Sequence, residues 1–152
     1  MRLMRDRLRC VLPGLWAGGL LCIAAIAAPA VFASLQSSDA GRVVSRIFVR
    51  EAWLSLAFGV VLLGLGRGRH PAAGGAAARR SERALLWGAI GCTLLGYFAV
   101  QPLMGAAREG GGMLGFGALH LISTVFYGTK TALVLWLAWC VAAGQPSRPP
   151  SS

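Results

Sequence analysis

The stretch Val11–Ala33, VLPGLWAGGLLCIAAIAAPAVFA, decides the fold class of this 152-residue chain. It lies inside a longer interval, Cys10–Ser38, that contains no charged residue. The hydrocarbon core of a bilayer is about 30 Å thick and a helix rises about 1.5 Å per residue, so about 20 apolar residues suffice to cross it. The run is continuously apolar rather than alternating, which favours a helix over a barrel strand. We therefore predict a transmembrane helix here.

Three further apolar segments follow, and the chain as a whole is 56% hydrophobic and only 13% charged. Soluble domains carry about 25% charged residues, so this composition argues against a soluble catalytic domain. The predicted spans are about 11–33, 44–66, 84–105 and 116–143. They leave no outside segment that could bury a core, so residues 1–152 are expected to form one all-α, integral membrane four-helix bundle. The tail 145–152, rich in proline and serine, is expected to be disordered.

The net charge of +10 is divided unequally between the two sides of this bundle. One side carries ten arginines, namely Arg2, Arg5, Arg7, Arg9, Arg67, Arg69, Arg79, Arg80, Arg83 and Arg148. The other side carries four, namely Arg42, Arg46, Arg50 and Arg108. The positive-inside rule then predicts both termini in the cytoplasm. The charge is thereby explained by the membrane rather than by nucleic acid, and the abundance of Arg, Ala and Gly favours a bacterial inner membrane.

The first segment also has features of a cleaved signal peptide, because Val31-Phe32-Ala33 before Ser34 resembles a small-residue cleavage site. Its apolar stretch of about 22 residues exceeds the usual 7–15, which favours retention as a membrane helix.

Small residues and prolines mark the first and third spans. Gly14 and Gly18 form a GxxxG pattern, which allows close helix packing, and we expect packing within the chain rather than dimerisation. In the third span, residues 88, 92 and 96 are Gly, Cys and Gly at four-residue spacing. Pro29 and Pro102 each remove a backbone hydrogen bond and are expected to kink or end their helices.

The fourth span carries polar residues along one face. At about 100° per residue they fall within about 120° of arc. The residues of this face are His120, Ser123, Thr124, Tyr127, Lys130 and Thr131. Lipid cannot satisfy these groups, so the face is predicted to point into the bundle or a wet cavity.

Lys130 lies near the middle of the fourth span, where a lysine costs about 2.5–3.5 kcal/mol on insertion scales. The best carboxylate partner is Glu51. Starting from Val44, Glu51 lies about 10 Å below the outer edge of the membrane and Lys130 about 20 Å below it. Side chains lean toward the N-terminus of their helix, here outward, so Lys130 reaches toward Glu51. We predict an ion pair, and propose this polar face with Glu51 as the candidate binding site.

Motifs for catalysis and cofactors are absent from the sequence. There is no HExxH, no phosphate-binding glycine loop and no credible triad, so no enzyme activity and no cofactor are expected. Met104 and Met113 near His120 hint at copper(I), because thioether ligands are soft, but a structural histidine is favoured and no metal site is assigned. The expected partners are the lipid bilayer and either a second copy or another membrane protein.

Short motifs spread over most of the chain resemble a small bacterial membrane domain of unknown function related to transmembrane protein 205. The motifs are Trp16-x-Gly18-Gly19, Ala28-Pro29-x-x-Phe32, Ala40-Gly41 with Phe48, and Leu119-His120-x-x-Ser123. A more distant resemblance is to membrane domains of the copper-resistance D type. The resemblance implies four helices and no established activity. Members of that family often carry Asn shortly after the Leu-His motif, where this chain has Tyr127 and Lys130.

Two functions are compatible with these observations. The first is a non-enzymatic binding or accessory protein whose polar face holds a partner, lipid or small solute. The second is a small transporter or metal-handling protein that uses the polar face of the fourth helix as a path.

Overall fold

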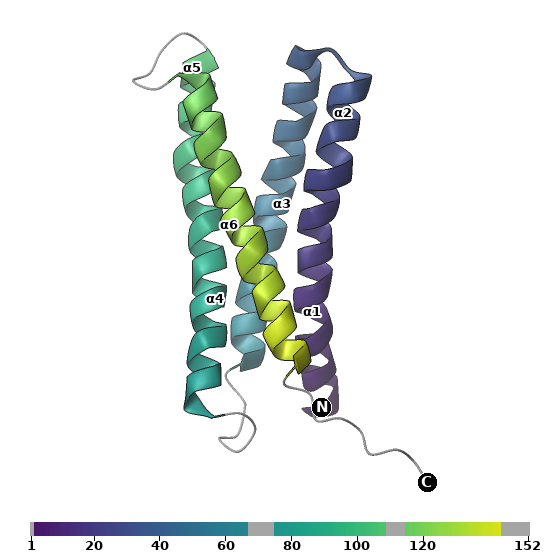
Figure 1. Ribbon diagram of the computed structural model, residues 1–152, viewed down its shortest axis with the longest axis vertical. Helices are drawn as coiled ribbons and strands as arrows, with labels where there is room; N and C mark the ends of the chain where they lie inside the picture. Colours follow the sequence, from purple (N-terminus) through teal and green to yellow (C-terminus); the bar gives the residue numbers. More distant parts are fainter. Residues whose placement is uncertain (1, 67–74, 109–114, 144–152) are drawn as a thin grey trace.

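The computed structural model describes residues 2–66, 75–108 and 115–143 and shows an all-α bundle of four long helices. The first helix is formed by α1 (Arg2–Cys22), η1 (Ile23–Ala27) and α2 (Ala28–Ser34), and the second is α3 (Ser37–Gly66). The third is formed by α4 (Ala76–Leu94), η2 (Leu95–Val100) and α5 (Gln101–Arg108), and the fourth is α6 (Phe116–Ala143). All four are long and apolar enough to cross a membrane, which confirms the predicted four-helix membrane fold (Figure 1).

The helices are longer than most of the predicted spans. The second helix begins at Ser37 rather than near 44, and the third at Ala76 rather than near 84. In both cases the extra turns carry arginines, which hydropathy excludes from a span although arginine is a good helix former. The predicted disordered tail 145–152 lies outside the described residues.

The two ends of the bundle differ in charge. We call the end where α1 and α4 begin and α3 and α6 finish the basic end, because α1 and α4 start with arginine-rich turns. The opposite end holds the short turn between α2 and α3 and the start of α6 (Figure 1). This turn is closed by the backbone of Leu35, whose N–H donates to the Val31 carbonyl over 3.1 Å.

Two of the three prolines inside the described helices, Pro29 and Pro102, lie directly after a π-helical segment. Pro29 is the second residue of α2, after η1, and Pro102 is the second residue of α5, after η2. In the first case the Ala28 N–H donates to the Ile23 carbonyl, five residues back. The helix therefore does not end at Pro29. The π-helical turn replaces hydrogen bonds to the fourth residue back by bonds to the fifth, just before the proline, which has no N–H to donate.

The tightly packed core occupies the half of the bundle nearer the basic end. Buried side chains from all four helices meet there, among them Trp16, Leu62, Ala89, Val134 and Leu137. Toward the opposite end α2 stays with α3, while α5 and η2 stay with α6. The ribbons accordingly diverge as two pairs of helices in that half (Figure 1).

The GxxxG pattern of the first helix does not pack against the rest of the chain. Gly14 and Gly18 are exposed, and a Cβ built on either would meet nothing within 4 Å. The expected packing within the chain is therefore wrong for these glycines. The buried face of α1 is carried instead by Trp16, Ala17 and Leu20, which leaves the glycines pointing outward.

The glycine at a close helix contact is Gly59 of α3. A Cβ there would lie 2.7 Å from Cγ1 and 2.9 Å from Cδ1 of Ile90 on α4. Gly88 is also close to α6, since its Cβ would lie 3.0 Å from Leu133 Cδ1. The small residues of the third span thus do allow helices to approach, as predicted.

Replacing Gly59 by Val is expected to lower the free energy of unfolding by about 1–3 kcal/mol, because the added methyl groups overlap the buried Ile90. The measurement is thermal unfolding in detergent followed by circular dichroism. Gly64→Val is the matched control, since a Cβ at Gly64 on the same helix meets nothing within 4 Å. Equal losses in the two variants would contradict a close contact at Gly59.

Candidate functional site

A cleft of about 660 Å³ lies in the half of the bundle where the two pairs of helices diverge. All four helices line it, and most of the lining is apolar, including Ala28, Phe32, Phe48 and Met104. The cleft begins near the turn between α2 and α3, where Ser37 lines it, and extends inward as far as Glu51 and Lys130. Beyond these two residues, toward the basic end, lies the packed core.

The predicted polar face of the fourth helix is brought to this cleft. Five of its members line the cleft, namely His120, Ser123, Thr124, Tyr127 and Lys130. The sixth, Thr131, is buried, and its hydroxyl donates to the Tyr127 carbonyl over 2.8 Å. The prediction that this face points into the bundle is confirmed.

The predicted ion pair between Glu51 and Lys130 is present. The Lys130 Nζ donates to both carboxylate oxygens of Glu51, at 2.8 Å each. The two residues are only 6% and 4% exposed, respectively. The ammonium also lies 4.8 Å from the centre of the Tyr127 ring, close enough for a cation–π contact. The pair joins α3 to α6 at the inner end of the cleft.

This network is completed by Ser55, which no sequence motif marked, and by Trp16, which belongs to a family-like motif but was not predicted to contact this pair. The Ser55 hydroxyl donates to Oε1 of Glu51, and the Trp16 indole Nε1 donates to the Ser55 hydroxyl over 2.9 Å. Ser55 is buried, as is Trp16, which stacks on Phe58. The spacing of four residues between Glu51 and Ser55 places both on one helix face and is the one sequence signal for this contact. Nothing in the sequence points to the contribution of Trp16.

Tyr127 connects the fourth helix to the first. Its hydroxyl donates to the backbone carbonyl of Leu20 over 2.8 Å, and its ring meets Phe48 edge-to-face at 5.2 Å. Tyr127 therefore lies inside the bundle, half-buried between α1 and α3. Together with the ion pair, it ties three helices at the inner end of the cleft.

Several polar side chains of the cleft make no hydrogen bond within the described part of the chain. They are Ser45 of α3, Gln101 of α5, and His120 and Ser123 of α6. The Thr124 hydroxyl, by contrast, is engaged with the His120 carbonyl over 2.9 Å. The His120 ring stacks on Phe116, with ring centres 6.1 Å apart. Ser45, Gln101, His120 and Ser123 can therefore donate to or accept from a guest molecule.

The cleft-facing positions of α3 and α6 correspond with a constant offset of 79 residues. The pairs are Ser37 and Phe116, Gly41 and His120, Val44 and Ser123, Ser45 and Thr124, Phe48 and Tyr127, and Glu51 and Lys130. The helices that precede α3 and α6 each carry a π segment followed by a proline, as described above. The chain is thus two helix hairpins of similar plan that face each other across the cleft, although their residue types differ.

The candidate metal ligands do not form a cluster. Among the described residues no group of three His, Cys, Asp or Glu side chains could hold a metal ion. Met104 and His120 both line the cleft, whereas Met113 lies outside the described residues. Among the described residues, Cys10, Cys22, Cys92 and Cys140 form no disulfide.

The four apolar helices and their cleft define a multi-pass membrane protein. Residues 11–113 match the family model described as Domain of unknown function (DUF4149), and the chain belongs to that family. The matched region contains Trp16, Glu51 and Ser55 but ends before α6, which supplies Lys130. Comparison with curated proteins and with solved structures found no match.

Proposed function

We propose that this chain is a non-enzymatic binding protein of a bacterial inner membrane, which holds a small amphipathic molecule in the cleft between its two hairpins. The observation that carries the proposal is the cleft itself. Its volume of about 660 Å³ falls within the range of about 300–1,000 Å³ that is usual for ligand sites. Such sites are mainly apolar with a few polar groups that orient the ligand, which describes this lining.

The ion pair closes the inner end of the cleft and does not act as a reactive group. Glu51 is bound by Lys130 and Ser55, and Lys130 is bound by both oxygens of Glu51 and faces the Tyr127 ring. Groups engaged in this way are poorly placed to exchange protons with a substrate. The polar groups left for the guest are those of Ser45, Gln101, His120 and Ser123.

The arginine distribution supports an orientation with both termini in the cytoplasm, so that the cleft opens in the outer half of the membrane. The Trp16, Ala28-Pro29 and Leu119-His120 motifs support a relationship to the transmembrane protein 205-like family.

Filling the cleft is expected to abolish binding of a single-chain amphiphile. The probe is radiolabelled oleate, titrated into the purified protein in detergent and measured by equilibrium dialysis. Ser123→Phe places a large ring into the cleft and is expected to weaken oleate binding at least about tenfold, since the guest and the ring compete for one volume.

The control for this prediction is Val125→Phe, two residues along the same helix. Val125 is 59% exposed and does not line the cleft, so its replacement is expected to leave binding unchanged. Both variants are first checked for a single symmetrical peak on gel filtration. Absence of saturable oleate binding, or equal binding by both variants, would contradict an amphiphile site in the cleft.

Transport is the second candidate function, favoured by the correspondence between the two hairpins. Transporters built from repeats bind their cargo between the repeats, and π turns are frequent at functional sites. The test is uptake of protons or copper(I) by proteoliposomes, with Ser123→Phe and Lys130→Met as the comparison variants. Uptake that both changes abolish supports transport, and no uptake of either cargo leaves the binding function.

A further inference from the structure

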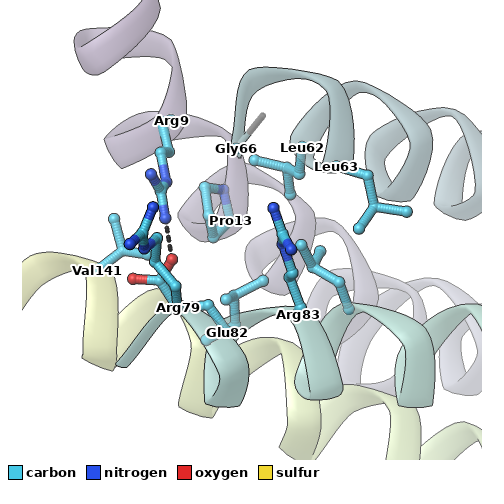
Figure 2. Close-up of a pocket in the computed structure, with 11 residues that line it drawn as sticks. Arg9, Pro13, Leu62, Leu63, Gly66, Arg79, Glu82, Arg83 and Val141 are labelled. Carbon is cyan, nitrogen blue, oxygen red and sulfur yellow. Dashed lines mark hydrogen bonds and ion pairs between the residues drawn. The ribbon is translucent and has the colours of Figure 1, made fainter. Parts of the chain in front are cut away.

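A crevice between the helices at the basic end combines three arginines with apolar side chains. Arg9 of α1 and Arg79 and Arg83 of α4 line it, together with Glu82. Figure 2 shows the Arg9 guanidinium directed at the Glu82 carboxylate, with which it forms an ion pair, and Arg79 beside the same carboxylate. The Arg83 side chain lies on the other flank and rises toward α3, near Leu62 (Figure 2).

The charges of this crevice do not cancel. Three guanidinium groups and one carboxylate line the crevice, so two positive charges are in excess near neutral pH. Among the described residues no ion pair involves Arg83, which is exposed. The crevice volume is only about 30 Å³, enough for about two waters, so a ligand must lie over its mouth rather than inside it.

The position of the crevice along the bundle indicates the kind of ligand. It lies where the apolar part of α1 begins after Arg9, where that of α4 begins after Arg83, and where α3 ends at Gly66. This is the depth at which lipid phosphates meet the hydrocarbon core. Leu63 and Val141, both half-buried, line the same crevice and offer contact to an acyl chain.

We infer that the mouth of this crevice binds the phosphate of an anionic phospholipid. The phosphate oxygens lie against Arg79 and Arg83, and the acyl chain lies against Leu63 and Val141. Guanidinium groups bind phosphate through paired N–H donors, and basic pockets between membrane helices on the cytoplasmic side hold anionic headgroups. A soluble phosphate shares the headgroup chemistry but gains nothing from the apolar side of the crevice.

The test is native mass spectrometry of the intact chain with equimolar phosphatidylglycerol and phosphatidylcholine of identical acyl chains. The wild type is expected to retain phosphatidylglycerol preferentially. Arg79→Gln with Arg83→Gln is expected to lower that preference roughly 25-fold, about fivefold for each arginine removed near the membrane surface. Arg83→Gln alone, which disturbs no ion pair among the described residues, is expected to lower it about fivefold.

The matched control is Arg46→Gln with Arg50→Gln, which removes two exposed arginines from α3, outside the crevice. This variant is expected to keep the wild-type preference. An equal loss in the control, no preference in the wild type, or full preference in Arg83→Gln would overturn the inference. Binding of glycerol 3-phosphate as tightly as phosphatidylglycerol would overturn the assignment to a lipid.

Discussion

Replacing Glu51 by Gln is expected to lower the free energy of unfolding by about 3–5 kcal/mol, the usual cost of leaving one partner of a buried ion pair without its counter-charge. Lys130 is 4% exposed, and its ammonium has 2.8 Å contacts to both Glu51 oxygens, so the carboxylate takes the place of most of the water that would otherwise solvate the charge. The measurement is thermal unfolding in detergent, with the yield of monodisperse protein as a second readout.

The double variant Glu51→Gln, Lys130→Met separates loss of the pair from loss of the fold. Removing the second charge is expected to restore part of the stability, because an uncharged pair of similar volume needs no counter-ion. Asp39→Asn is the surface control: Asp39 pairs with Arg42, but the two side chains are 51% and 74% exposed, so the loss is expected to stay below about 1 kcal/mol. A double variant no more stable than Glu51→Gln alone would refute the pairing.

Trp16→Ala is expected to cost about 3–5 kcal/mol, the range for removing a buried aromatic side chain. Trp16 is 3% exposed, stacks on Phe58 and donates to Ser55, so the change opens a void and withdraws a donor from the Glu51 network. Thermal unfolding measures the loss, and Trp16→Phe, which keeps most of the ring volume, is expected to lose less.

The matched control for Trp16 is Trp136→Ala in the fourth helix. Trp136 is 61% exposed on the outside of the bundle, so its removal leaves no internal void. A much smaller loss is expected there, since an exposed ring packs against lipid in the folded and unfolded states alike. Comparable losses in the two variants would show that Trp16 does not form part of a packed core.

The sequence was sufficient for the fold because it contains four apolar segments that are each long enough to cross a membrane, although the helices continue past the arginines that flank them. The Glu51–Lys130 pair could also be predicted, because Glu51 was the best-placed carboxylate for Lys130. The predicted depths differed by about 10 Å, whereas each residue is the fifteenth of its helix, since the second helix begins at Ser37 rather than near 44. The polar face of α6 followed from helical periodicity. All three inferences use distances along single helices, which the residue order determines.

The sequence could not predict which face of each helix packs against its neighbours, because this depends on how the helices are rotated about their axes. Gly14 and Gly18 looked like packing residues, yet the side chains of Trp16 and Leu20 take the buried face of α1. Gly59 has the close contact, and the Ser55-xxx-Gly59 spacing that could have indicated it was not singled out. The sequence predicted a polar face directed into the bundle or a wet cavity, but not the size of the cleft, because the cleft arises where the hairpins diverge rather than from any one segment.

The equivalent placement of Glu51 and Lys130 has a consequence for biogenesis. Each is the fifteenth residue of its helix, and each hairpin brings one charge of opposite sign to the same depth. A hairpin that inserts into the membrane alone places its Glu51 or Lys130 side chain in the hydrocarbon without a counter-charge, and the other hairpin supplies that counter-charge. We therefore expect insertion and docking of the two hairpins to be coupled. Until the second hairpin inserts, Glu51 of the first hairpin has no lysine to pair with, and in a chain truncated after α3 it stays without that partner.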